Sequence, residues 1–252
     1  MKAYIQTKQT GRVLNTNIFN AEEGFLEMGI ETVHFYHYHE LERSGIQRGD
    51  IVVSGIGPVE NRLNDLGITV PCLDYPEELK SYLGRNIWKS HINTINSSPE
   101  LWPVFVKPVA NKRFTGVVVR ELKDLIGCGS YFDNYEVYCS EVLDIISEWR
   151  VFVRYGEIIS ARHYKGDWRV HYNAEVIENA VDTYQKSGNA PAGYGIDFGV
   201  TKDGKTILIE VNDGYSIGCY GLPALEYAKL LSARWAELTG TTDECQSLEI
   251  YY

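Results

Sequence analysis

The chain has 252 residues, of which 44% are hydrophobic and 23% charged, a balance typical of globular proteins that excludes a disordered chain. Its net charge is −10, so it lacks the general attraction to phosphate on which nucleic-acid binding depends, and we expect no nucleic-acid partner. No apolar run reaches the ~18 residues of a membrane span, and we expect no membrane partner. The five cysteines form no C-x-x-C pair, which disfavours a disulfide framework or a structural zinc site and favours the reducing cytoplasm.

Residues 1–85 alternate strand-like and helical patterns. Apolar runs begin near Ala3, Thr32 and Asp50, and helical patterns follow the first and the third of them. This alternation predicts a small parallel α/β domain. His37 and His39 alternate along the second run, which is compatible with a metal site or with a half-buried aromatic strand. The absence of a third ligand nearby favours the strand.

The rest of the chain favours an antiparallel α+β arrangement. A helical pattern covers about residues 84–95, and a second helix is expected between Pro223 and Gly240, which have the residue types that begin and end helices. The tail, residues 239–252, has no evident partner. Between the two helices the sequence predicts seven strands with short turns, over residues 102–109, 116–122, 136–143, 148–154, 157–164, 194–200 and 206–211.

The strongest chemical signal is a predicted hairpin that carries two acids. Asp203-Gly204 lies between two apolar runs and indicates a two-residue turn, which would place Asp197 directly opposite Glu210. Asn212 shares the face of Glu210, because side chains alternate along a strand. Two carboxylates and an amide oxygen on one face suit a hard cation such as Mg²⁺. An exposed face with unrelated acids is the alternative.

Several basic residues could bind an anion. Lys107 ends a strand-like run and precedes a proline, and Lys112 follows in the next turn. If the turn at 155–156 has two residues, Arg162 lies opposite Trp149; with one residue more, it lies opposite Arg150. Two facing arginines would suit a phosphate or a carboxylate between them. His163 and Lys165 on the same strand are further candidate donors.

Taken together, these motifs resemble the ATP-grasp superfamily. The resemblance covers about residues 86–238, and the arginine pair is most similar to compact amide-ligase branches, including the tubulin-tyrosine-ligase-like one and small bacterial and phage relatives. It implies an ATP-grasp fold preceded by the parallel α/β domain, with a lysine subdomain over 86–140 and a metal and substrate subdomain over 141–238. The motifs occur in the family's order: FVKPV at Lys107, SEVLD at Glu141, EWR at 148–150, IDFGV at Asp197 and IEVND at 210–212.

The resemblance also implies a role for each matching residue. Lys107 and Lys89 would contact the ATP phosphates, with Lys112 above them in a loop that has one glycine. Many relatives carry an arginine two residues before the metal aspartate, where this chain has Gly195, so Arg150 or Arg162 would supply that charge. The remaining roles are adenine and ribose binding by Glu141, Val142, Leu143 and Glu148, catalysis by Arg150 and Arg162, metal binding by Asp197, Glu210 and Asn212, and substrate contacts by His163, Lys165, Tyr215 and Ser216.

The implied activity is that of an ATP-dependent carboxylate–amine ligase. ATP and one or two Mg²⁺ ions, or Mn²⁺, would activate a carboxylate as an acyl phosphate, and an amine would then displace phosphate. The substrates would be small molecules or peptides. The alternatives are an ATP-grasp kinase that phosphorylates a hydroxyl and a nucleotide-binding module without catalysis. The sequence does not determine the oligomeric state.

Overall fold

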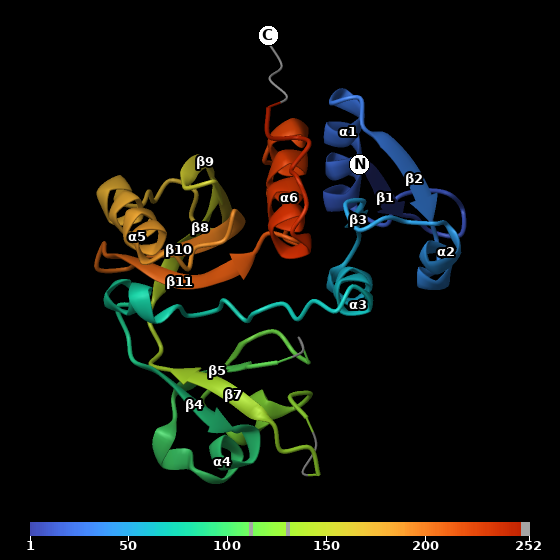
Figure 1. Cartoon of the computed structure of the whole chain (residues 1–252). Helices are drawn as coiled ribbons and strands as arrows, with labels where there is room; N and C mark the ends of the chain where they lie inside the picture. The colour runs from blue at the N-terminus through green and yellow to red at the C-terminus, as the bar shows by residue number, and fades with distance from the viewer. Residues whose placement is uncertain (111–112, 130–131, 248–252) are drawn as a thin grey trace. The chain divides into compact units, whose positions relative to one another are not determined.

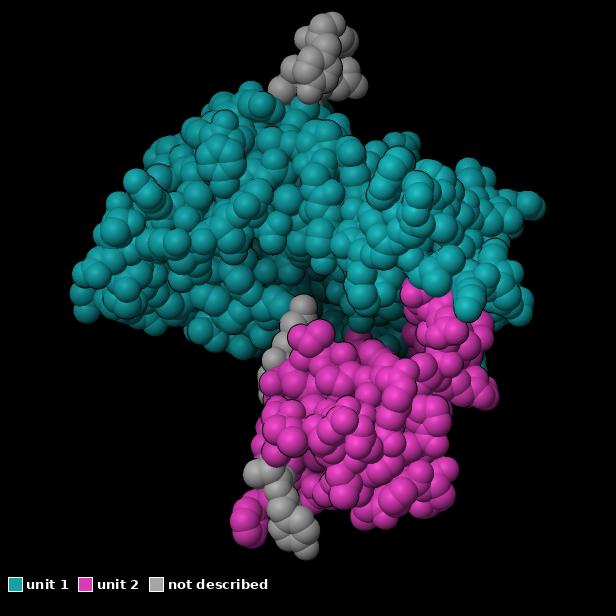
Figure 2. Space-filling model, turned by 180° about the vertical axis from the view of Figure 1, so that it is seen from behind, with its two compact units in different colours: residues 1–82, 146–252 teal, residues 83–145 magenta. Residues whose placement is uncertain are grey.

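The computed structural model describes residues 1–110, 113–129 and 132–247. The chain forms two compact units, coloured separately in Figure 2. Unit 1 comprises residues 1–82 together with 146–252, and unit 2 comprises residues 83–145. The mixed α/β fold class expected from the sequence is confirmed, since one sheet is parallel and two are antiparallel.

Unit 1 begins with the predicted parallel α/β layer. Its sheet has the strand order β2-β1-β3, and both strand pairs are parallel. The expected strand through His37 and His39 is shorter than predicted, because the chain turns at Tyr36 and His37 is the N-cap of a short helix. The elements are β1 (Lys2–Gln6), α1 (Thr16–Glu27), β2 (Glu31–Phe35), α2 (Tyr38–Arg43), β3 (Ile51–Val53) and α3 (Ile56–Asp65).

The second part of unit 1 is an antiparallel sheet with two long helices. The sheet has the order β11-β10-β8-β9, so both predicted hairpins are present. Helix α5 was not expected from the sequence pattern. The elements are η1 (Glu77–Tyr82), β8 (Ile145–Arg154), β9 (Glu157–Gly166), α5 (Ala174–Ser187), β10 (Gly193–Thr201), β11 (Thr206–Asp213) and α6 (Ala224–Thr239).

Helix α6 joins the two layers of unit 1. It begins after Pro223 and ends at Gly240, which is left-handed with φ 65°, as the sequence predicts. The helix is buried on most of its surface because α1 packs against it from one layer and β10 from the other (Figure 1). One core contains Phe25 of α1, Phe152 of β8 and Trp235 of α6.

Unit 2 is a smaller antiparallel sheet with short helices. Its strand order is β4-β7-β5-β6. The helix expected over 84–95 is present only in the last part of that range, because a strand precedes it. Val106, Val137 and Cys139 are fully buried in its core. The elements are β4 (Ile87–His91), α4 (Ile92–Ser97), η2 (Pro99–Leu101), β5 (Val104–Pro108), β6 (Val117–Val119), η3 (Leu122–Leu125) and β7 (Glu136–Ser140).

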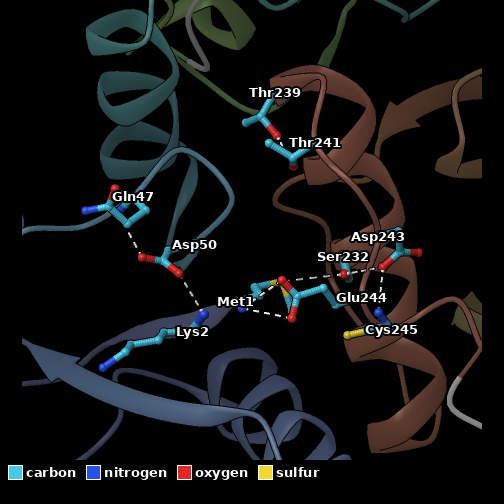
Figure 3. A network of polar contacts seen from close by, with 10 residues as sticks. All are labelled: Met1, Lys2, Gln47, Asp50, Ser232, Thr239, Thr241, Asp243, Glu244 and Cys245. Carbon is cyan, nitrogen blue, oxygen red and sulfur yellow. Dashed lines mark hydrogen bonds and ion pairs between the residues drawn. The ribbon is translucent and has the colours of Figure 1, made fainter.

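The first residues of the tail have partners that the sequence analysis did not identify. Asp243 is buried and accepts hydrogen bonds from the Ser232 hydroxyl at 2.6 Å and from the Tyr155 hydroxyl at 2.8 Å. Glu244 accepts a bond from the Met1 amino group at 2.8 Å (Figure 3). The tail therefore connects α6, β1 and the β8–β9 turn. Among the described residues, no helix is long and apolar enough to cross a bilayer.

The contact between α1 and α6 depends on Gly24. A Cβ built at Gly24 would lie 2.1 Å from the Ala224 carbonyl oxygen and 2.8 Å from the Ala228 Cβ, so the helices would have to separate. We expect Gly24→Ala to lower the free energy of unfolding by about 2 kcal/mol. Gly57→Ala is the matched control, because a Cβ there meets nothing within 4 Å. Urea denaturation measures both, and equal stability of the two variants would contradict this packing.

Candidate functional site

The β10–β11 hairpin brings the two predicted metal-binding acids together. Asp197 lies directly opposite Glu210, as predicted, although the turn between the two strands differs from the one expected. The turn is one residue longer than expected, because the Gly204 N–H donates to the Thr201 carbonyl and Val200 pairs with Thr206. A bulge between Asp197 and the next residue shifts the register back by one. The acids therefore share a face.

Asn212 lies between the two carboxylates. Its Nδ2 donates to Asp197 Oδ2 at 3.3 Å and to Glu210 Oε1 at 3.2 Å. The three predicted metal ligands thus form one cluster in unit 1. Glu210 and Asn212 are half-buried, whereas Asp197 is 2% exposed.

Arg150 of β8 holds Asp197 from the neighbouring strand. Its Nε and Nη2 each donate to one carboxylate oxygen at 2.7 Å, so the pair is bidentate and buried. Burial raises the pKa of the Asp197 carboxyl, and the hydrogen bonds from Arg150 oppose that rise. Burial also disfavours the charged guanidinium, but the bonds to Asp197 outweigh it and raise the pKa of Arg150. Arg150 therefore stays charged and fixes Asp197 in place.

Gly195 provides the space for this arginine. A Cβ built at Gly195 would lie 3.1 Å from Arg150 Cδ and 2.4 Å from Ile217 Cδ1. Arg150 thus passes over Gly195. The sequence analysis expected Arg150 or Arg162 to supply the missing charge, and Arg150 is the one that contacts Asp197.

Two tyrosines cover the Arg150 guanidinium. The Tyr164 and Tyr220 rings are stacked, with centroids 4.8 Å apart, and the guanidinium carbon lies 4.9 Å from the Tyr220 centroid and 6.0 Å from that of Tyr164. Contact with aromatic faces favours the cation. Burial and the charges of Asp197 and Glu148 raise the pKa of Tyr164. Tyr164 was not among the predicted site residues; the period-two pattern that links Arg162 to residue 164 was the available signal for it.

The β8–β9 hairpin places the second predicted arginine beside the first. Tyr155 and Gly156, with φ of 48° and 83°, form the shorter two-residue turn. A bulge between Phe152 and Val153 then shifts the register, so that Arg162 lies opposite Arg150 rather than opposite Trp149. The turn therefore has the length of the first alternative left open by the sequence, and Arg162 has the cross-strand partner of the second.

Arg162 differs from Arg150 in its partners. Its Nε is buried without a hydrogen-bond partner, and it forms no ion pair within the described ranges. An unsatisfied guanidinium nitrogen next to an acidic cluster is suited to an anionic ligand. Two positions before Arg150, Glu148 accepts a hydrogen bond from Lys165 at 2.6 Å, so these two predicted residues bind each other.

His163 does not join this group. It pairs with Trp149 across the strands, one position away from the Arg150–Arg162 pair, and therefore lies on the other face of the sheet. Its ring packs edge-on against the Trp149 ring, with centroids 5.1 Å apart. The predicted substrate contact of His163 remains a prediction that this geometry does not favour.

Unit 2 aligns the two predicted phosphate lysines. Tyr138 of the central strand β7 pairs with Lys89 of β4 on one side and with Lys107 of β5 on the other. Directly paired residues share a face, so both lysines flank the Tyr138 side chain. Lys89 Nζ lies 5.5 Å from the Tyr138 centroid. Lys112 lies outside the described residues.

The segment after β7 contains the residues expected to contact adenine. The Glu141 carboxylate accepts hydrogen bonds from the Asn86 backbone N–H at 3.0 Å and from the Asn86 side-chain amide at 3.2 Å. Val142 and Leu143 are half-buried and belong to no strand. Glu141 thus fixes the start of an irregular segment whose backbone groups are not used in a sheet.

A pocket of about 250 Å³ lies within unit 1, lined in part by the loop that follows β11. Tyr215 and Ser216 line it, and both are fastened to the N-terminal layer: the Tyr215 hydroxyl donates to Glu60 at 2.7 Å, and the Ser216 hydroxyl donates to the Ser54 carbonyl at 3.0 Å. Gly218 also lines it, and a Cβ there would lie 3.8 Å from Arg150 Nη1. The structure therefore places the predicted residues Tyr215 and Ser216 in the wall of this pocket, and their predicted substrate contacts remain a prediction.

The cluster fits a hard divalent cation in its chemistry. It offers only oxygen-bearing side chains, and the amide that bridges the two carboxylates can present its oxygen instead of its nitrogen by rotation. Because Arg150 already neutralises Asp197, Glu210 and Asn212 are the residues best placed to bind such an ion.

The different partners of the two arginines predict different effects on stability. Arg150→Ala would leave the buried Asp197 without its counter-charge, so we expect the free energy of unfolding to fall by about 3 kcal/mol or more. Arg162→Ala breaks no ion pair of the described chain and should change it by less than about 1 kcal/mol. Urea denaturation of both variants measures this, and equal losses would contradict the assignment.

Comparison with known proteins agrees with this geometry. A search of curated protein sequences finds no match. Among solved structures, the fold is similar to D-alanine–D-alanine ligase from Bacillus anthracis complexed with ATP, with a TM-score of 0.57, 16% identity and coverage of 95% of this chain and 97% of the other. D-cycloserine synthetase DcsG gives 0.57 and 13%, with 93% and 100% covered. The ATP-grasp ligase PsnB, complexed with a minimal precursor, gives 0.52 and 16%, with 92% and 98% covered.

The family comparison covers more than half of the chain. A sequence profile described as ATP-grasp domain, R2K clade family 2, matches residues 82–230. This range contains both predicted lysines of unit 2 and the Arg150, Asp197 and Glu210 cluster of unit 1. The chain therefore belongs to the ATP-grasp family, in its R2K clade.

Proposed function

We propose that the protein is an ATP-dependent carboxylate–amine ligase that releases ADP and phosphate. The observation that carries this proposal is the cluster of Asp197, Glu210 and Asn212, with Arg150 fixed on Asp197 and Arg162 beside it. This arrangement can neutralise the charge of a phosphoryl group during transfer. Membership of the ATP-grasp family supports the same conclusion.

The proposed reaction has two steps. A carboxylate oxygen of the first substrate attacks the γ-phosphorus of ATP, the bond to the β-phosphate oxygen breaks, and ADP leaves. An amine then attacks the acyl carbon of the acyl phosphate, the carbon–oxygen bond to phosphate breaks, and the amine loses a proton to solvent. The protein contributes position and charge, since none of these steps needs a nucleophilic side chain.

Each unit, taken by itself, contains residues that we assign as nucleotide ligands. Lys89 and Lys107, which flank Tyr138, would bind phosphate oxygens, and Lys112 would add a third positive charge. The backbone of Val142 and Leu143, fixed by the Glu141–Asn86 bonds, would bind the adenine. Glu148 would bind the ribose, which requires it to exchange its exposed partner Lys165 for a hydroxyl.

We assign the metal site to Glu210, Asn212 and Asp197. One or two Mg²⁺ ions, or Mn²⁺, would supply positive charge to the phosphates. Asp197 would act mainly through its fixed position, because both of its oxygens accept bonds from Arg150. Arg162, which has no acidic partner among the described residues, would contact the transferred phosphoryl group.

The substrates are proposed to be a carboxylic acid and an amine of small-molecule or peptide size. D-alanine–D-alanine ligase and the PsnB complex with its precursor illustrate both sizes within the same fold. Within the described residues no cysteine forms a disulfide, and four of the five cysteines are buried, which is compatible with the reducing cytoplasm as the site of action.

The direct test is a search for the product. Purified protein is incubated with Mg·ATP and a pool of carboxylic and amine metabolites, and mass spectrometry looks for a product one water lighter than a substrate pair. We expect such a product with the wild type and a loss of at least about 100-fold in Glu210→Gln. Asp203→Asn is the matched control, because Asp203 lies exposed in the turn of the same hairpin.

The result separates the alternatives. Formation of a phosphoester without an amide would show that the activity is that of a kinase and not that of a ligase. ATP binding without any product from small molecules or peptides would favour a binding module. An unchanged rate in Glu210→Gln would refute the metal assignment.

The lysine assignment has its own prediction. Lys107→Ala and Lys89→Ala should each raise the KM for ATP by about tenfold or more, because each loses a charged hydrogen bond to phosphate. Lys123→Ala is the control, since its exposed ammonium pairs with Glu121 in unit 2. Steady-state kinetics of ADP formation measures the three variants, and an unchanged KM for both predicted residues would contradict the assignment.

A further inference from the structure

We infer that Tyr220, stacked on Tyr164, is a positioning residue that holds Arg150 in the orientation required for phosphoryl transfer. Its effect on catalysis rests on the proposed function, but its effect on Arg150 is measured without turnover. Three features of unit 1 carry this inference: the backbone conformation of Tyr220, the β-bulge at Tyr164 and the hydrogen bonds of the Arg150 guanidinium.

Tyr220 has a backbone conformation that glycine would adopt at lower cost. Its φ of 42° lies in the left-handed region, where the Cβ of an L-residue crowds the neighbouring backbone. In the described ranges, Tyr155 with φ of 48° is the other non-glycine residue with a positive φ. Such a conformation persists only where the surrounding contacts compensate for it, so the Tyr220 side chain must have contacts that offset the strain.

The contacts of Tyr220 are those of its ring. The residue is 44% exposed, so burial in a core does not explain the strain. Its hydroxyl forms no hydrogen bond with a residue that the structure describes. The ring instead stacks on Tyr164, with an interplanar angle of 15°, and its centroid lies 4.9 Å from the guanidinium carbon of Arg150. The strain is therefore offset by a ring placed over a buried cation.

A β-bulge brings the Tyr164 ring to the same cation. The register of β8 and β9 shifts between Glu148 and Trp149, and Tyr164 is the extra residue on β9. Its ring centroid lies 6.0 Å from the Arg150 guanidinium carbon. Two irregularities of the backbone, the bulge at Tyr164 and the left-handed conformation of Tyr220, thus direct two aromatic rings toward one guanidinium.

The rings and the Asp197 carboxylate restrict different motions of the guanidinium. Asp197 accepts hydrogen bonds from Nε and Nη2, which are donors in the plane of the group, whereas a ring over the group leaves these donors in use. The rings also exclude water, which strengthens the ion pair. The Nη1 group has no hydrogen-bond partner among the described residues and is available for an anionic oxygen. Tyr220 therefore sets the orientation in which Arg150 Nη1 meets the transferred phosphoryl group.

Three variants separate the role of the ring from that of the fold. Tyr220→Gly removes the ring without adding backbone strain, because glycine adopts the left-handed conformation readily. Tyr220→Phe retains the ring and removes only the hydroxyl. Tyr155→Gly is the matched control, because Tyr155 is also left-handed and 42% exposed, and its ring centroid lies 5.0 Å from the guanidinium carbon of Arg154 instead of that of Arg150.

Exchange of the Arg150 Nε proton with water reports directly on the guanidinium. This proton forms a buried hydrogen bond to Asp197, and NMR of the full chain follows its exchange, with the signal assigned by its loss in Arg150→Lys. We expect exchange to be at least about tenfold faster in Tyr220→Gly and unchanged in Tyr220→Phe and Tyr155→Gly. Urea denaturation verifies that each variant is folded.

The kinetics of ADP formation test the consequence for catalysis. Tyr220 acts on the transferred group through Arg150 and not on the binding of ATP. Tyr220→Gly should therefore lower kcat at least about tenfold and change the KM for ATP by less than about twofold. Tyr220→Phe and Tyr155→Gly should retain the kcat of the wild type.

The other outcomes overturn the inference. These are unchanged proton exchange in folded Tyr220→Gly, an equal acceleration in Tyr155→Gly, or an acceleration in Tyr220→Phe equal to that in Tyr220→Gly. Faster exchange with an unchanged kcat would refute the role of Tyr220 in catalysis. Faster exchange in a protein whose wild type forms no ADP would keep the assignment of Tyr220 to Arg150 and refute the ligase.

Discussion

The buried pair of Arg150 and Asp197 is the interaction on which the rest of the site depends. A carboxylate that is 2% exposed needs a counter-charge, and the bidentate guanidinium supplies it. The pair also sets the geometry around it. Gly195 must lack a side chain to admit the arginine, and the ring of Tyr220 covers the guanidinium. Residues from β8, β10 and the loop after β11 are therefore constrained by one ion pair.

Two β-bulges create this arrangement, and they act in the same way. Each hairpin has a turn that would give the wrong register, and each bulge corrects it by one residue. In β10–β11 the bulge returns Asp197 to the position opposite Glu210. In β8–β9 the bulge changes the cross-strand partner of Arg162 from Trp149 to Arg150. Because a shift of one residue moves a side chain to the other face, the acids and the arginines could not cluster without the bulges.

These bulges also explain how far the sequence could predict the site. The strands and their order in the hairpins follow from apolar periodicity and turn residues, because the core anchors them. The facing pair of Asp197 and Glu210 was predicted from a turn one residue too short, and a bulge restores it. The bulges carry no comparable sequence signal, so the Arg162 register stayed open. The stacking of Tyr164 on Tyr220 could not be predicted for another reason: the two residues are distant in the chain, and their rings meet beside Arg150 only in the folded structure.

The loop after β11 links the acidic cluster to the pocket. Its start is fixed by Asp213, whose two oxygens accept bonds from Arg234 of α6 at 2.7 and 2.6 Å, and its middle is fastened to the N-terminal layer through Ser216 and Cys219. One short segment thus leads from the acidic cluster, past Arg150, to the wall of the pocket. Ile217 and Gly218 belong to both places, because they line the pocket and also lie beside Gly195 and Arg150. A substitution in this short loop would therefore affect the surroundings of the Arg150–Asp197 pair and the wall of the pocket together.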